Sequence, residues 1–189
     1  MNWIIFGIGM VWLAIISWFD IRKNEIPHPA WVVIPLMLAC LYRVEQGEWS
    51  LVLMAVAVSM ASEREWFATF LKMDEVRMLL SWTPLLFLGL YFGVQDAPIA
   101  AMAILGFWLA WELKCWGGAD AVAAITVILL YPMTEFLVAF LVVHVLTTVI
   151  LWMGSIIKKT EWKTHRVPGL PLIWISLIFL PFLQRGISA

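Results

Sequence analysis

Charged residues are scarce in this chain, and their scarcity excludes most classes of soluble protein. Asp, Glu, Lys and Arg make up only 13% of the 189 residues, whereas 63% are hydrophobic and the mean hydropathy is +0.94. Soluble domains are about 25% charged and about 45–50% apolar. The composition therefore predicts a protein that crosses a membrane several times. The net charge of −1 argues against a nucleic-acid partner, because such a partner calls for a strongly basic surface.

Cysteine and histidine are also rare, which limits the chemistry that the chain can perform. Cys40 and Cys115 are too few for a four-thiolate zinc site and indicate no disulfide framework. His28 and His165 lie in polar segments outside any HExxH motif, and His144 stands alone in an apolar segment, as a core histidine would. The serines form no GxSxG nucleophile motif. We therefore expect neither a metal ion nor a cofactor.

Eight apolar segments, separated by polar connections, account for most of the chain. They are Trp3–Phe19, Ala30–Tyr42, Trp49–Ala61, Met78–Val94, Ile99–Leu113, Ala121–Tyr131, Phe136–Ile157 and Pro168–Leu183. A membrane-spanning helix needs about 20 apolar residues, with a range of about 17–25. No basic residues of a cleavable signal peptide precede the first segment, so we interpret it as a retained span. The pattern predicts an all-α, polytopic transmembrane bundle of eight spans in one domain, residues 1–189. Because the second, third and sixth segments are short, six spans is the alternative.

The longest polar stretch, residues 62–77, separates the third apolar segment from the fourth. Four large apolar residues, Trp66, Phe67, Phe70 and Leu71, recur within it at helical spacing. This pattern predicts an amphipathic helix that lies in the membrane interface.

The distribution of basic residues predicts the orientation of the bundle. With eight spans, ten of the twelve Lys and Arg residues fall on one side of the membrane, namely Arg22, Lys23, Arg64, Lys72, Arg77, Lys114, Lys158, Lys159, Lys163 and Arg166. The positive-inside rule makes this side cytoplasmic. Four spans separate Asp20 from Asp120, and an even number of crossings returns the chain to the same side. We therefore expect both aspartates at cytoplasmic helix ends in the cell membrane.

Asp20 closes the first apolar segment, and Asp120 opens the sixth directly after Gly117–Gly118–Ala119. An ionisable residue at the end of a membrane helix is costly to keep dry, which makes it a functional candidate. Two carboxylates at one site cannot both ionise cheaply, so one pKa rises and the other falls. The ionised member can then take a proton from water while the protonated member donates to a scissile carbonyl, as in aspartic proteases. We expect the glycines to form an active-site loop, either through a positive φ or as an extended edge that pairs with substrate.

Three short motifs accompany these aspartates. Trp18–Pro27 places Asp20 at a helix end, with a basic residue shortly after it and an aliphatic residue followed by proline. Gly117–Asp120 is a glycine-rich sequence that ends in aspartate, and Val167–Pro171 is a proline-rich start to the last apolar segment. In this order the motifs resemble the signatures of type IV prepilin peptidases and archaeal preflagellin peptidases, the GxGD-type aspartyl membrane proteases.

The resemblance implies an aspartyl endopeptidase in which Asp20 and Asp120 are the catalytic pair. The family removes a short basic leader from type IV pilin-like or archaellin precursors on the cytoplasmic side of the membrane. A precursor protein and the lipid bilayer are then the expected partners, and a homo-oligomer is left open. Acidic side chains on that side would dock the leader, and the available cluster is Glu63, Glu65, Asp74 and Glu75. The alternative interpretation of this cluster is a solvated surface balanced by neighbouring basic residues.

The chain departs from the family pattern at several points. Val122 stands where the family usually has lysine two residues after the second aspartate, and Ala119 stands where many members have glycine. Bacterial members with N-methyltransferase activity carry a cysteine-rich zinc loop. Because this chain has only two cysteines, we expect no methyltransferase activity.

Two other interpretations use the same two acids. In a non-catalytic membrane protein, Asp20 and Asp120 would serve only as helix-terminal residues, although the C-terminal end of a helix disfavours an acid such as Asp20. In a small proton-coupled transporter they would form a proton relay, although no other acid lies deep in an apolar segment.

Overall fold

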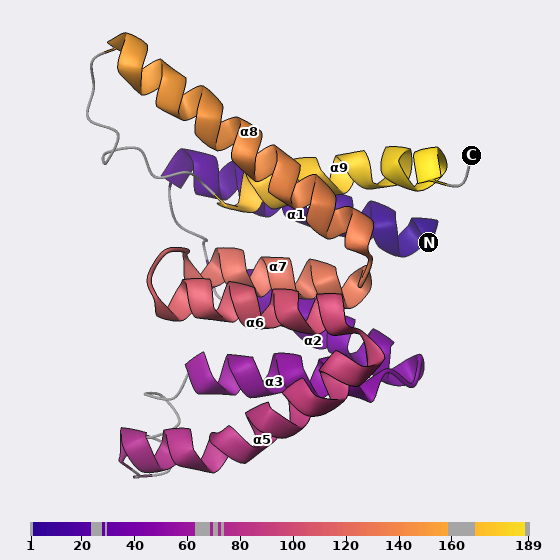
Figure 1. Cartoon of the computed structure of the whole chain (residues 1–189), viewed down its shortest axis with the longest axis vertical. Coiled ribbons are helices and arrows are strands. Elements are labelled where there is room, and N and C mark those ends of the chain that lie inside the picture. Colours follow the sequence, from indigo (N-terminus) through magenta and orange to yellow (C-terminus); the bar gives the residue numbers. More distant parts are fainter. Residues whose placement is uncertain are drawn as a thin grey trace. The chain divides into compact units, whose positions relative to one another are not determined.

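The computed structural model describes residues 2–23, 28, 30–62, 69, 72, 74–158 and 169–187, and no strand occurs among them. The helices of this part are α1 (Trp3–Lys23), α2 (Ala30–Glu45), α3 (Trp49–Ser62), α5 (Glu75–Asp96), α6 (Pro98–Glu112), α7 (Gly118–Leu130), α8 (Thr134–Lys158) and α9 (Gly169–Ile187) (Figure 1). The predicted all-α fold class is confirmed for the described residues.

Each predicted apolar segment corresponds to one helix, with shifted ends. Helix α1 continues past Phe19 to Lys23, so Asp20 lies inside its last turns rather than beyond it. Helices α5 and α6 are joined by Ala97 alone, and Pro98 begins α6, where its missing N–H costs no hydrogen bond. Of the predicted amphipathic stretch, Ser62 ends α3 and the last residues, from Glu75, begin α5. Most of that stretch lies outside the described residues.

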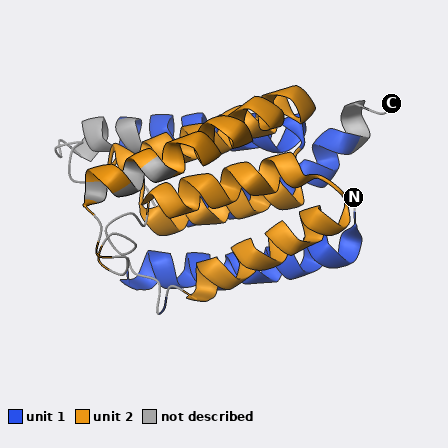
Figure 2. Cartoon of the chain, turned by 90° about the horizontal axis from the view of Figure 1, so that it is seen from below, with its two compact units in different colours: residues 1–28, 133–189 blue, residues 29–132 orange. Residues whose placement is uncertain are grey.

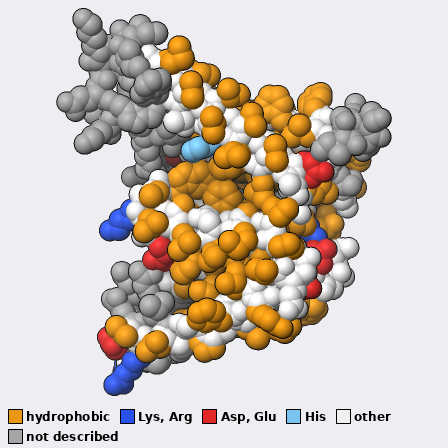
Figure 3. All heavy atoms as spheres, in the orientation of Figure 1, with side chains coloured by type: hydrophobic (Ala, Val, Ile, Leu, Met, Phe, Trp, Pro, Cys, Tyr) orange, Lys and Arg blue, Asp and Glu red, His pale blue; other side chains and the backbone are white. Residues whose placement is uncertain are grey.

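Among the described residues, α1 is the one helix that is both long and apolar enough to cross a membrane, with 21 residues. Helices α3, α6 and α7 have 14, 15 and 13 residues. Their lengths are therefore about 20–23 Å, whereas the hydrocarbon core of a bilayer is about 30 Å thick. Hydrophobic side chains nevertheless cover much of the face seen in Figure 3. The structure thus supports membrane association through α1, and the eight-span topology stays a prediction.

The chain divides into two compact units, which we describe separately (Figure 2). Unit 1 comprises Met1–His28 and Met133–Ala189 and contains α1, α8 and α9. Helix α9 packs against both α1 and α8. Ile173 and Leu177 of α9 and Leu13 of α1 are fully buried. Unit 1 is therefore held together by the apolar residues of α9.

Unit 2 comprises Pro29–Pro132 and contains α2, α3, α5, α6 and α7. Helix α7 contacts α2, α3 and α6. Every residue of α7 from Ala123 to Leu129 is buried. A helix that is apolar on all sides belongs in the interior of a protein. Helix α7 is accordingly the core helix of unit 2, and Asp120 lies at its start.

Helix α5 approaches its neighbours closely at two glycines spaced four residues apart. A Cβ atom added to Gly89 would lie 2.9 Å from Cα of Met54 in α3, and one added to Gly93 would lie 3.1 Å from Cβ of Ala101 in α6. Paired small residues at this spacing allow helix backbones to pack closely, as in GxxxG motifs of membrane helices. The two glycines therefore fix α5 against α3 and α6.

We predict that Gly89→Ala destabilises the protein by about 1–3 kcal/mol, the usual cost of overpacking. The added methyl group would meet the backbone of α3, which cannot rotate aside as a side chain could. Gly106→Ala in α6 is the matched control, because a Cβ atom there has no neighbour within 4 Å. That variant should gain up to about 1 kcal/mol from its higher helix propensity. Thermal unfolding of the purified variants measures both effects, and an unchanged midpoint for Gly89→Ala would contradict the close approach.

Candidate functional site

Asp120 lies in the first turn of α7 and is buried, with 5% of its surface exposed. Gly117 is the residue before the helix, with φ −69° and ψ 145°, and Gly118 is the first helical residue. Gly118 and Ala119, two of the three residues predicted to form a loop, belong to α7. The positive end of the helix dipole favours a carboxylate at the position of Asp120. Burial distinguishes this carboxylate from a solvated residue at a helix start.

The turn that leads to Asp120 is closed by backbone hydrogen bonds. The N–H of Cys115 donates to the carbonyl of Ala110 at 2.9 Å, and the N–H of Lys114 donates to the carbonyl of Trp111 at 2.9 Å. These two bonds form the Schellman motif at the C-terminus of α6. Lys114 has φ 57°, the left-handed conformation that glycine usually supplies in this motif. The residue with positive φ in this turn is therefore Lys114 and not a glycine.

Gly118 is needed for space rather than for its backbone conformation. A Cβ atom added to it would lie 2.8 Å from Cε2, 2.9 Å from Nε1 and 3.0 Å from Cζ2 of Trp111. Gly117 has a negative φ and Gly118 is helical, and neither is among the described residues with positive φ. The expectation that these glycines supply a positive φ is therefore wrong. Gly118 instead lets the indole of Trp111 lie directly against the first turn of α7.

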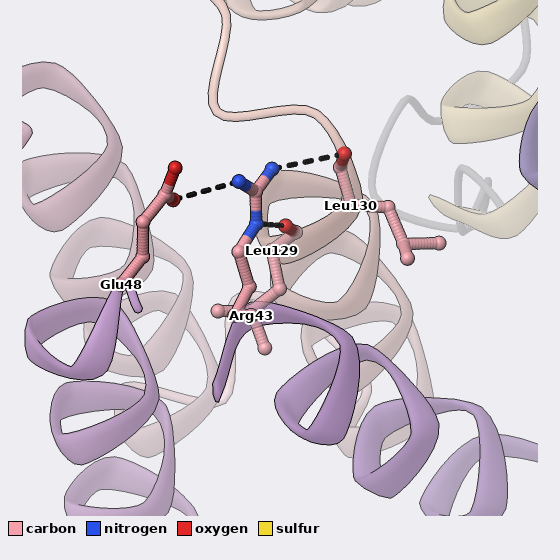
Figure 4. A network of polar contacts seen from close by, with 4 residues as sticks. All are labelled: Arg43, Glu48, Leu129 and Leu130. Atoms are coloured by element: carbon pink, nitrogen blue, oxygen red, sulfur yellow. Dashed lines mark hydrogen bonds and ion pairs between the residues drawn. The ribbon is translucent and has the colours of Figure 1, made fainter. Parts of the chain in front are cut away.

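The opposite end of α7 is closed by Arg43, a buried residue of α2 (Figure 4). Its Nε donates to the carbonyl of Leu129, and its Nη2 donates to the carbonyl of Leu130 at 3.0 Å. Its Nη1 forms an ion pair with Glu48 at 2.7 Å. The last carbonyls of a helix lack partners inside the helix, and a cation is favoured beside them. Arg43 therefore holds the C-terminal end of the helix that carries Asp120.

Val122 lines an apolar cavity of about 670 Å³ between α2 and α3, together with Trp111 of α6. Residues two apart on a helix point in nearly opposite directions, about 200° apart. Val122 thus faces this cavity, whereas Asp120 faces away from it. Cys40 and Ser59 are the only polar residues among those that line the cavity in the described part of the chain. A lysine at position 122 would place a cation in these apolar surroundings, which is costly, and valine avoids that cost.

Asp20 lies near the end of α1 in unit 1 and is 7% exposed. The buried residues of α1 form one stripe that ends at Asp20 and also contains Gly9, Leu13, Ile16 and Ser17. Arg22 belongs to the exposed side of the helix, where its guanidinium lies 4.1 Å from the ring of Trp18. Because the C-terminal end of a helix disfavours a carboxylate, the stability of α1 gives no reason for Asp20 to be there.

The two aspartates belong to different units, Asp20 to unit 1 and Asp120 to unit 2. Their approach to one another therefore stays a prediction. Of the acids predicted to dock a leader, Asp74 precedes α5 and is exposed, and Glu75 is the first residue of α5. Glu63 and Glu65 lie outside the described residues. The docking role also stays a prediction.

Arg43 and Trp111 support the candidate site, and both were missed in the sequence. Arg43 directly follows the second apolar segment, Ala30–Tyr42, which contains no basic residue. A single basic residue next to an apolar segment indicates that its side chain binds a polar group inside the protein. For Trp111 the sequence contains no such signal, because its contact with Gly118 depends on the packing of α6 against α7.

No protein-family model, no curated protein and no solved structure matches the chain.

We predict that Arg43→Met lowers the stability of the protein by roughly 2–4 kcal/mol, because it leaves two carbonyls at the end of α7 without donors. Glu48→Gln is the matched control, since Glu48 is 46% exposed and its ion pair should contribute about 0–1 kcal/mol. Thermal unfolding of both variants checks this difference. Equal shifts of the two midpoints would show that the carbonyl contacts are unimportant.

We also predict that Gly118→Ala destabilises unit 2, because its methyl group and the indole of Trp111 cannot occupy the same space. The double variant Gly118→Ala/Trp111→Leu lacks the crowded indole atoms and should be destabilised by less than the sum of the two single changes. Unfolding midpoints of the two single variants and the double variant give this coupling. Additive effects would rule out a steric contact between the two positions.

Proposed function

We propose that this chain is a membrane aspartyl endopeptidase that removes the short basic leader from type IV pilin-like or archaellin precursors on the cytoplasmic side. The observation that carries the proposal is a difference in burial. Among the described residues, Asp20 and Asp120 are the only buried Asp or Glu side chains. They are also the two acids that the sequence motifs single out. Since burial of a carboxylate is costly, its occurrence at both motif positions supports a chemical role.

The proposed mechanism uses the two carboxyl groups as general base and general acid. The ionised carboxylate takes a proton from a water molecule, whose oxygen attacks the carbonyl carbon of the scissile peptide bond. The protonated carboxyl group donates to the carbonyl oxygen as the tetrahedral intermediate forms. The C–N bond then breaks as the carboxyl group that received the water proton gives it to the leaving amine, and a hydroxyl of the intermediate returns its proton to the other carboxylate. This chemistry requires the two groups to differ in protonation, as neighbouring carboxyls do.

The proposed setting is a multi-span bundle in the cell membrane. Helix α1 has the length and composition of a span, which supports the setting. The exposed apolar side chains of the other helices, such as Leu141 and Ile150 of α8, also fit contact with lipid. In this arrangement the ends of α1 and α7 that carry Asp20 and Asp120 face the cytoplasm.

A non-catalytic role at helix ends accounts less well for the same residues. It fits Asp120, which lies at the favourable end of α7. It does not fit Asp20, which is buried at the unfavourable end of α1.

We predict that Asp20→Asn and Asp120→Asn each abolish leader removal and leave the protein folded. Asparagine keeps the shape of the side chain and removes the ionisable group. Glu112→Gln is the matched control, because Glu112 is the acid nearest to Asp120 in the sequence and is not buried. The assay is co-expression with candidate precursors and detection of the shortened product on a gel. Full cleavage by either asparagine variant would remove that aspartate from the mechanism.

A further inference from the structure

Ser17 carries a buried hydroxyl whose hydrogen bonds are not satisfied by the described part of the chain. Its side chain is 3% exposed, and its Oγ atom has no hydrogen-bond partner among the described residues. Leu13 and Ile16, which belong to the same buried stripe of α1, are fully buried. A buried hydroxyl without a hydrogen bond destabilises a protein, because it has lost its hydrogen bonds to water without replacement. A hydroxyl in this place therefore points to a hydrogen-bonding group other than the described residues.

Other helical hydroxyls in the chain show how Ser17 could have been satisfied. Ser59, Ser62, Thr126 and Ser176 each donate to the carbonyl four residues earlier, at distances between 2.6 and 3.0 Å. Such local bonds are the usual solution for a hydroxyl inside a helix. Ser17 does not form this bond, although it lies well inside α1. Its hydroxyl is therefore available to another group.

Asp20 lies one helical turn after Ser17 on the same buried stripe of α1. The Cβ atoms of residues three apart on a helix are about 5–6 Å apart. The side-chain oxygens that these two Cβ atoms carry can therefore lie within the about 5 Å that one water molecule bridges through two hydrogen bonds of about 2.8 Å. A buried water needs at least two polar partners, and the Ser17 hydroxyl and the Asp20 carboxylate supply them.

We propose that Ser17 and Asp20 hold one water molecule between them, and that this water is the nucleophile of leader cleavage. The second part rests on the proposed function. The Ser17 hydroxyl donates to the water oxygen, and the water donates one of its hydrogens to the ionised Asp20 carboxylate. The second lone pair of the water oxygen stays free to attack the scissile carbonyl carbon, and the donated proton passes to Asp20 as the bond forms. Ser17 is thus a positioning residue that acts through this water.

In the described parts of α1 and α9, few charged side chains accompany Asp20. Helix α9, which packs against α1, contains no Asp, Glu, Lys, Arg or His from Gly169 to Gln184. On α1 itself the charged residues besides Asp20 are Arg22, which lies over Trp18, and Lys23. The quantity that tests this assignment is the charge state of Asp20 with and without the Ser17 hydroxyl.

The first test measures steady-state cleavage of a purified pilin-like or archaellin precursor by the full chain in lipid vesicles. Ser17→Ala should lower kcat by about 10–100-fold with KM within twofold, because the water loses its orientation. Ser17→Thr keeps a hydroxyl and should recover most of that loss. Ser176→Ala is the matched control, since Ser176 is a buried hydroxyl of unit 1 that already donates to Leu172. A kcat for Ser17→Ala within twofold of the unaltered protein would overturn the nucleophile assignment.

The second test needs no cleavage and separates the water site from the proposed function. Dicyclohexylcarbodiimide reacts with protonated carboxyl groups in membrane proteins, and mass spectrometry can follow its attachment to Asp20. A hydrogen-bonded water favours the ionised carboxylate, so Ser17→Ala should label faster than the unaltered protein at the same pH. Ser176→Ala should label at the unaltered rate. Faster labelling without cleavage by any form of the chain would keep the water site and reject the peptidase, whereas unchanged labelling would overturn the water site.

Discussion

The burial of α7 is the constraint on which unit 2 and the candidate site depend. This 13-residue helix has no solvent-facing side along Ala123–Leu129, so both of its ends need partners from elsewhere in the unit. At the C-terminal end, the guanidinium of Arg43 meets two carbonyls. At the N-terminal end, Trp111 lies against Gly118. Asp120 is thereby attached to a helix fixed at both ends, which is the condition for a carboxylate to hold a defined position.

Local patterns were sufficient to predict where the helices lie. Long apolar runs marked each one, although the ends are shifted. Helix α6, for example, begins at Pro98, one residue before the predicted segment, because proline fits the first helical position. The two aspartates could be found in the same way, since an acid next to an apolar run is unusual in any context. Their burial could not be predicted from the sequence, because it depends on how the helices pack.

Features that depend on packing between helices could not be predicted. Gly118 was expected to serve the backbone, yet the left-handed residue of the turn is Lys114, and Gly118 makes room for an indole seven residues earlier. Arg43 was not among the candidate site residues predicted from the sequence, whereas its side chain turns inward and donates to two carbonyls at the end of α7. In each case the deciding contact joins two helices, and single-sequence periodicity contains no information about which side chains meet across them.

The central claim is that Asp20 and Asp120 meet at one site, and cross-linking tests it most directly. In a full-length protein with Cys40→Ser and Cys115→Ser, the aspartates are replaced by cysteines, and a mercuric ion is offered as a bridge between two thiolates. We predict that proteolytic fragments containing positions 20 and 120 are recovered joined through the metal ion in a single chain. If each cysteine reacts alone with a maleimide but the two are never joined, the carboxylates do not share a site, and the aspartyl mechanism is contradicted.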